Sequence, residues 1–260
     1  MTDAATVANY TLAFTAIQEK TGLAAAAIWA ELGSWNEADV ALFVAQLEPV
    51  ISTAAVTVSR AVDAEFARIV SARPIGVPSD VVSGLRGDVD MLEAYRRPFI
   101  QVWTDLSKGV PWEDAVKHGG DMAASMARTD VSLAQGKAAD YLTVKRADVV
   151  GYRRVINGGA CMFCAAASTR IYNGKLRKIN LHTNCKCGVA PVTADGRDPA
   201  QDANDIYLDR LKSRGPDYWK QSGFVDGNGD PIDPTNLSAL REFDETERTR
   251  QLGVVLALTR

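Results

Sequence analysis

The chain has 260 residues, of which 47% are hydrophobic, and it carries a formal net charge of −3. This length can bury a sizeable core, and the hydrophobic fraction is that of an ordinary globular protein. Residues 1–20 lack the basic start and unbroken apolar stretch of a secretory signal, and the apolar run Gly22–Ala30 is too short to cross a membrane. We therefore expect a soluble protein that is made in the cytoplasm and has no membrane contact.

The N-terminal half is predicted to be helical almost throughout. Alanine-rich segments at 4–20 and 24–32 carry apolar residues three and four positions apart, and glycines separate the segments. The sequence Ser34-Trp-Asn-Glu37 fits a capping box, so Ser34 is the expected N-cap of a long helix. Pro49 is the expected position of any bend in that helix.

Two further helical blocks follow at 79–108 and 112–145, and Pro111 stands at a favourable first-turn position of the second block. Together with the earlier segments, they predict a helical bundle over residues 1–145. The tryptophans of this half are interpreted as packing anchors, because aromatic side chains dominate core burial.

Beyond the bundle the pattern changes from helical to mixed. Residues 149–156 alternate enough to form a strand, and a helix is predicted at about 162–168. Further strands are predicted at about 170–175 and 187–192. Residues 146–192 are therefore expected to form a small α+β module, and the fold class is α+β, mainly α.

The C-terminal part, residues 193–260, is predicted to be a linker followed by a helical extension. Residues 193–205 are polar and are interpreted as an exposed linker, and helices are predicted at 205–213 and 236–251. The acidic sequence at 226–230 lacks the glycine and the bidentate glutamate of a calcium loop, so a surface turn or hairpin is expected there.

The four cysteines of the chain all fall within 27 residues, as Cys161-Met-Phe-Cys164 and Cys185-Lys-Cys187, and His182 stands three residues before the second pair. Such clustering indicates a soft metal, most commonly Zn²⁺ in a structural role. Five donors compete for four tetrahedral positions, so one of His182, Cys185 and Cys187 is expected to be spare. The alternatives are a disulfide, which the cytoplasm disfavours, or buried thiols that act as small hydrophobes.

Positive charge is concentrated in the same part of the chain. Residues 145–187 contain nine basic residues and one acidic residue, a net charge of +8, whereas the rest of the chain is net acidic. Such a patch attracts phosphate backbones or an acidic protein surface. Arg153, Arg154, Arg177 and Lys178 are therefore candidate contacts for nucleic acid or a partner. The alternative is that these residues only compensate the negative charge of zinc thiolates.

The motifs of this module resemble those of a known family. Residues 154–172 contain the Cys-x-x-Cys pair and then an Ala-Ser-Thr stretch, and residues 179–192 contain His-x-x-Cys-x-Cys. In this order they resemble the phage Mu F-like (MuF) minor head proteins, and especially the actinobacteriophage branch that often carries the label capsid maturation protease. The resemblance covers residues 149–192, and Thr183 stands where the family often has proline.

The resemblance implies a phage minor capsid protein that assists head assembly, DNA packaging or ejection. Its expected partners are the portal protein, capsid or scaffold protein, and packaged DNA. It would be made in the host cytoplasm and would lie inside the capsid near the portal, as part of the virion. The alternatives are a maturation protease that cleaves scaffold or capsid protein, and a nucleic-acid-binding module.

The residues give little support to proteolysis. The sequence has neither His-Glu-x-x-His nor Gly-x-Ser-x-Gly. Ser168 with Lys175 or Lys178 could form a dyad, and His182 could activate a nearby thiolate, but spacing alone produces such pairs by coincidence. Ser168 and Thr169 are instead expected to cap a helix or to satisfy backbone groups. No catalytic residue is assigned, and a non-enzymatic role is favoured.

Overall fold

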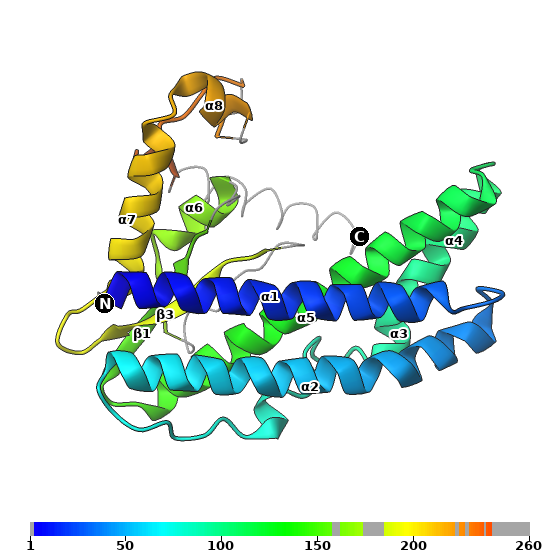
Figure 1. Cartoon of the computed structure of the whole chain (residues 1–260), viewed down its shortest axis with the longest axis horizontal. Helices are drawn as coiled ribbons and strands as arrows, with labels where there is room; N and C mark the ends of the chain where they lie inside the picture. The colour runs from blue at the N-terminus through cyan, green and yellow to red at the C-terminus, as the bar shows by residue number, and fades with distance from the viewer. Residues whose placement is uncertain are drawn as a thin grey trace, which may run out of the picture. The chain divides into compact units, whose positions relative to one another are not determined.

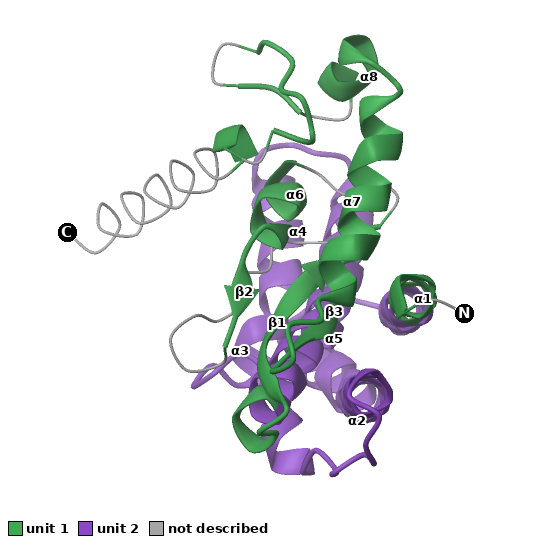
Figure 2. Cartoon of the chain, turned by 90° about the vertical axis from the view of Figure 1, so that its left-hand side faces the viewer, with its two compact units in different colours: residues 1–12, 143–180, 186–260 green, residues 13–142, 181–185 purple. Residues whose placement is uncertain are grey.

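The computed structural model is mainly helical, with 67% helix, 8% strand and one small three-stranded sheet (Figure 1). This confirms the predicted fold class. The structure describes residues 3–157, 162–173, 185–221, 224–226, 229–236 and 238–240. Two compact units are present (Figure 2): unit 1 comprises residues 1–12, 143–180 and 186–260, and unit 2 comprises residues 13–142 and 181–185. The units follow spatial packing and therefore differ from the three consecutive segments expected above.

Unit 2 is built from helices, some of them long. The two alanine-rich segments form one continuous helix, and the block predicted at 79–108 is divided into three short helices. The helices are α1 (Asp3–Ala30, from Ala13 onward), α2 (Glu37–Ile69), η1 (Ser79–Val82), α3 (Met91–Tyr95), α4 (Arg97–Ser107) and α5 (Trp112–Lys145, as far as Leu142). The bounds of α5 agree with the prediction.

The start of α2 differs from the predicted capping box. Asn36 is the N-cap, and its side-chain oxygen accepts hydrogen bonds from the backbone amides of Ala38 and Asp39 at 2.9 and 3.2 Å. Ser34 instead donates its backbone amide to the Asp39 carboxylate at 2.9 Å. Asparagine and serine are comparable N-caps, so residue type alone could not choose between the two positions.

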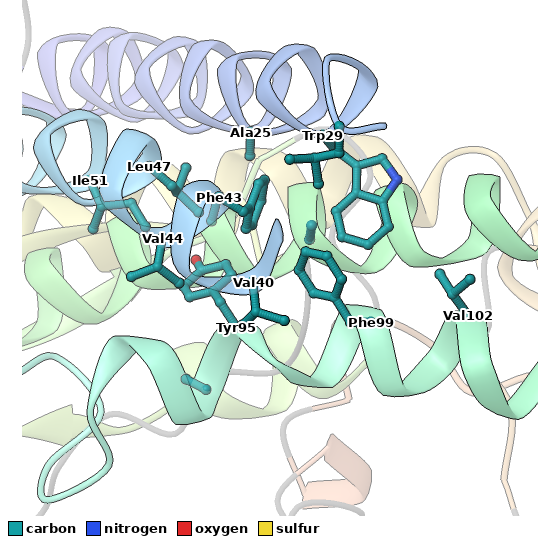
Figure 3. Close-up of a cluster of buried hydrophobic side chains, with 14 of the residues drawn as sticks. Ala25, Trp29, Val40, Phe43, Val44, Leu47, Ile51, Tyr95, Phe99 and Val102 are labelled. Atoms are coloured by element: carbon teal, nitrogen blue, oxygen red, sulfur yellow. The ribbon is translucent and has the colours of Figure 1, made fainter. Parts of the chain in front are cut away.

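Buried aromatic side chains form the core of unit 2 (Figure 3). The Trp29 ring lies 4.7 Å from the Phe99 ring and 5.6 Å from the Phe43 ring, measured between centroids, and the second pair is edge-to-face. Such geometries are favourable for aromatic pairs. The Trp29 indole donates a hydrogen bond to the Val116 carbonyl at 3.0 Å, so its polar atom is satisfied. Trp29 is thus a packing anchor, whereas Trp112 is 48% exposed.

Helix α2 is the described helix that is long and apolar enough to cross a membrane, judged by length and composition alone. Its 33 residues exceed the length of the apolar run Gly22–Ala30 that was considered in the sequence. Fifteen of its 33 residues are buried, and several of them, including Phe43 and Leu47, belong to the aromatic core. The core helix of a globular protein passes the same test, and packing against this core accounts for the apolar face of α2.

Unit 1 contains the sheet, whose strands have the order β2-β1-β3 and are antiparallel. On the central strand, Tyr152 lies opposite Tyr172 on one side and Pro191 on the other. The two tyrosine rings stack with centroids 5.6 Å apart. A strand, a helix and two further strands follow one another in the chain, which confirms the α+β module predicted at 146–192. The elements are β1 (Val149–Val155), α6 (Met162–Ser168), β2 (Ile171–Tyr172), β3 (Gly188–Thr193), α7 (Pro199–Lys212) and α8 (Pro216–Gln221).

The segment interpreted as a linker contains the first two turns of α7. The side chain of Asp198 caps this helix by accepting a hydrogen bond from the Gln201 amide at 3.0 Å, and Pro199 occupies the first turn. An acidic N-cap followed by proline is a strong helix start, so the prediction of a linker to residue 205 is wrong. Helix α8 was not predicted.

The structure confirms the turn predicted at 226–230, whereas it describes only part of the predicted C-terminal helix. Asp226 donates its backbone amide to the Asp230 carbonyl at 2.9 Å, and Val225 forms a β-bridge with Pro231, which confirms the turn. Residues 238–240 are helical, whereas the remainder of the helix predicted to residue 251 lies outside the described residues.

We expect Gly119→Ala to destabilise unit 2 by about 1–3 kcal/mol through overpacking. A Cβ atom at this position of α5 would lie 2.6 Å from side-chain atoms of Trp29 and Val102, and 2.9 Å from the Pro98 carbonyl oxygen. This crowding opposes the gain of roughly 1 kcal/mol in helix propensity. Urea unfolding would measure the change.

The matched control is Gly33→Ala, because no heavy atom lies within 4 Å of the position that its Cβ would take. We expect this control to change the free energy of unfolding by less than about 0.5 kcal/mol. A stabilised Gly119→Ala variant would show that the aromatic core is less tightly packed than described.

Candidate metal centre

Three of the predicted metal donors converge. The sulfur atoms of Cys164, Cys185 and Cys187 all lie within 4.8 Å of one another, and all three residues are buried. Around a tetrahedral ion with metal–sulfur bonds of about 2.3 Å, ligand sulfurs are roughly 3.8 Å apart. The triad is therefore compatible with one shared ion, and thiolate donors suit a soft metal.

The other two predicted donors, Cys161 and His182, lie outside the described residues, as do Arg177 and Lys178. Competition among five donors therefore stays a prediction. Both members of the second cysteine pair belong to the triad.

Local structure explains how the cysteines are placed. Cys164 lies on α6, which follows β1, and Cys187 immediately precedes β3. Cys185 is joined to Cys187 through Lys186, whose carbonyl accepts a hydrogen bond from the Asn157 side chain at 2.9 Å. The ends of β1 and β3 thus bring segments that are distant in sequence to the same place.

The backbone of Cys185 is held by polar side chains that sequence reasoning missed. Its carbonyl accepts hydrogen bonds from Gln18 Nε2 at 2.8 Å and from Ser132 Oγ at 3.3 Å. Gln18 also donates to Ser132 Oγ at 2.6 Å, and both residues are almost fully buried. Buried polar side chains that donate to a carbonyl help to fix that part of the backbone. The only signal of this role in the sequence was a glutamine and a serine within segments predicted to be helical.

Arg154 brings a positive charge to the triad. It is 0% exposed, and its Nη1 atom donates to Cys164 Sγ at 3.6 Å. The guanidinium carbon also lies 5.9 Å from the centre of the Phe163 ring. A buried guanidinium is unfavourable unless a negative group compensates it. A Cys164 thiolate would be such a group, and the thiolate is also the form that binds metal.

Arg153 is committed to the interior of unit 1 as well. Its Nε donates to Asp198 Oδ2 at 2.8 Å, and its Nη1 donates to the Ser168 carbonyl at 2.9 Å. It therefore joins β1 to the start of α7 and to the end of α6. Only 7% of Arg153 is exposed.

The burial of Arg153 and Arg154 corrects the prediction that they contact nucleic acid or a partner. Both faces of the central strand β1 are covered, since six of its seven residues are buried. Arg146, another of the nine basic residues in this segment, is also buried and lies 3.3 Å from an Asp148 carboxylate oxygen. Arg154 lies beside a cysteine sulfur, as the alternative of compensating thiolate charge expects, whereas Arg153 and Arg146 lie beside carboxylates.

Ser168 and Thr169 have the backbone role that was predicted. The Ser168 hydroxyl donates to the Ala165 carbonyl at 2.7 Å, and the Thr169 hydroxyl donates to the Ala166 carbonyl at 2.9 Å. Ser168 is only 2% exposed, so its hydroxyl is inaccessible to solvent. Lys175, the nearer of its two suggested partners, lies outside the described residues.

Asn204 joins α7 to the central strand, and the sequence analysis missed it because it lay in the supposed linker. Its side-chain oxygen accepts from the Ile156 amide at 2.9 Å, and its side-chain nitrogen donates to the Arg154 carbonyl at 2.8 Å. The residue is 1% exposed. The helix-start signal at Asp198 and Pro199 would have placed Asn204 on a helix.

Comparison with known proteins finds no matching family model, no similar curated protein and no similar solved structure.

We expect Asn204→Ala to destabilise the protein by about 2–4 kcal/mol, because it leaves a buried amide and a buried carbonyl without partners. The control is Gln201→Ala on the same helix, which removes an exposed hydrogen bond to Asp205. That control should change the free energy of unfolding by less than about 0.5 kcal/mol. Urea unfolding at fixed zinc concentration measures both variants, and equal effects would contradict the role assigned to Asn204.

Proposed function

We propose that this chain is a phage minor head protein of the MuF-like type, whose metal centre is a structural Zn²⁺ site. The identification rests on the order of the motifs within residues 149–192. The observation that carries the structural role is the buried convergence of Cys164, Cys185 and Cys187. The convergence supports the proposal because these cysteines belong to both motifs by which the chain resembles the family.

Zinc suits this donor set better than the harder divalent ions, since thiolates favour soft or borderline metals. Either Cys161 or His182 would complete a tetrahedral site with the three cysteines. Structural zinc sites have four protein ligands, whereas catalytic sites keep one position open. The three described cysteines are at most 3% exposed, which supports a closed structural site. When bound, the metal supplies folding free energy to a small module.

We further propose that the protein acts through surfaces that bind other head components. Its partners would be the portal protein and capsid or scaffold protein, with packaged DNA as a further contact, and its location would be inside the virion near the portal. The buried Ser168 hydroxyl favours this role over proteolysis. The internal positions of Arg153 and Arg154 favour a protein partner over DNA as the main contact.

We expect the purified wild-type chain to hold about one zinc ion per molecule, and Cys164→Ser to lose it. Removing one of three converging thiolates weakens the site, and the Arg154 charge loses its nearest sulfur. Elemental analysis and thermal unfolding would measure zinc content and stability. Cys161→Ser and His182→Ala, compared in the same assay, would identify the fourth ligand.

Ser168→Ala is the matched control, because it alters the same helix and leaves every thiol in place. It should keep its zinc. Removal of zinc from the wild-type chain by a chelator should lower the melting temperature, since structural zinc contributes on the order of 10 kcal/mol to the folding of small modules. A Cys164→Ser variant that keeps both zinc and melting temperature would rule out the site.

The assembly role predicts a stable complex with a portal protein and no cleavage of capsid or scaffold protein. Co-purification, followed by incubation with both candidate substrates, tests the two predictions in one sample. Specific cleavage that disappears in Ser168→Ala would support the protease alternative instead. Failure to bind either portal or procapsid would contradict the assembly role while leaving the zinc site unaffected.

A further inference from the structure

Unit 2 contains a cavity of about 300 Å³ that none of the roles above uses. It lies between α2 and residues 82–91, and Asp130 of α5 also lines it. Its lining contains apolar side chains together with four carboxylates and one guanidinium. The lining residues used below are apolar Ile51, Leu85 and Met91, and charged Glu48, Asp88 and Asp130.

Asp130 places a buried carboxylate at this cavity, and only 2% of the residue is exposed. Tyr95 donates its hydroxyl to Asp130 Oδ2 at 2.6 Å, and Arg86 Nε lies 2.8 Å from Oδ1. The charge of Arg86 is therefore already committed to Asp130. The Arg86 guanidinium also donates to the Met126 carbonyl at 3.1 Å.

One carboxylate oxygen of Asp130, Oδ1, lacks a hydrogen bond among the described residues. Among the described residues, neither Asp130 Oδ1 nor Arg86 Nε has a well-directed hydrogen bond, so their 2.8 Å contact is an ion pair of poor geometry. Burial raises the pKa of Asp130, and the opposing effects of Arg86 and Tyr95 do not restore it. The Oδ1 atom, which has no hydrogen bond among the described residues, can still accept one from an N–H donor when the carboxyl group is ionised.

Two exposed carboxylates of the lining add further negative charge. Glu48 and Asp88 are exposed, and neither forms an ion pair with any residue that the structure describes. Asp90 accepts a hydrogen bond from the Glu93 amide at 2.7 Å as the N-cap of α3. With one guanidinium against four carboxylates, the lining is net negative, which favours cations and disfavours phosphate.

We propose that this cavity receives an arginine side chain from a protein partner. The apolar lining residues suit an aliphatic stem, and the carboxylates suit a guanidinium that donates several hydrogen bonds. The volume is at the lower end for ligand pockets, which run from about 300 to 1,000 Å³, so it suits one side chain better than a large cofactor. The inference concerns only unit 2 and is independent of the zinc site and of the phage assignment.

The test is an NMR titration of the full-length, zinc-loaded chain with acetyl-arginine amide. The matched probe is acetyl-citrulline amide, which has nearly the same shape but a neutral urea in place of the guanidinium. We expect saturable shifts of amides in residues 48–55 and 82–91 with the arginine probe. The citrulline probe should bind at least about tenfold more weakly, since charge-assisted hydrogen bonds are lost.

Two double variants separate the cavity from general electrostatic attraction. Glu48→Gln with Asp88→Asn should weaken binding of the arginine probe about five- to tenfold, as expected for two partly exposed charge pairs. Glu31→Gln with Glu113→Gln makes the same change in net charge at exposed positions of unit 2 that do not line the cavity. This control pair should leave binding within about twofold of wild type.

Three outcomes would overturn the proposal. One is the absence of a saturable response at about 10 mM probe, a concentration at which even a weak site would respond. The second is equal weakening by both double variants, which would mean diffuse attraction. The third is saturable binding of free agmatine without binding of acetyl-arginine amide, which would mean a site for a small amine instead of a protein side chain.

Discussion

The contact between Arg154 and Cys164 is the interaction on which the module of unit 1 most depends. A guanidinium with no exposed surface lies beside a sulfur atom on the central strand's neighbouring helix. If the three clustered cysteines were neutral thiols, this sulfur would offer no negative charge to the guanidinium, and a buried charge is costly without compensating groups. A metal ion keeps its cysteine ligands ionised and so maintains negative charge beside Arg154. Metal binding and the burial of Arg154 are therefore expected to be coupled.

Other contacts extend from the same strand. Arg153 reaches the N-cap of α7 and the C-terminal end of α6, while Asn204 bonds to the backbone on both sides of Val155. The strand is thus tied to two helices by side chains that are themselves buried. Such networks are stable when every member is satisfied and weak when one is missing, because each loss leaves another buried polar group unpaired. Unit 2 has a different basis, since tilted and edge-to-face aromatic rings form its core.

The sequence was sufficient where the signal is local. Proline at position 111 predicted the start of α5, and the close spacing of the cysteines predicted that several of them would meet. Local signals were insufficient where two residues are chemically equivalent, as with Ser34 and Asn36 as N-caps. They also failed for Arg153 and Arg154, because whether an arginine faces solvent depends on what covers both faces of its strand. The polar partners Gln18 and Ser132 were missed for the same reason.

The two units show why net charge along a sequence does not by itself define a binding surface. Three arginines of the strongly basic segment are buried, and each lies beside a sulfur atom or a carboxylate. Unit 2 instead leaves Glu48 and Asp88, which line a cavity, exposed and without a cationic partner among the described residues. A charge contributes to recognition only when the fold leaves it accessible and incompletely paired. By that criterion, the acidic cavity of unit 2 is a better candidate for partner recognition than the buried arginines of the basic segment.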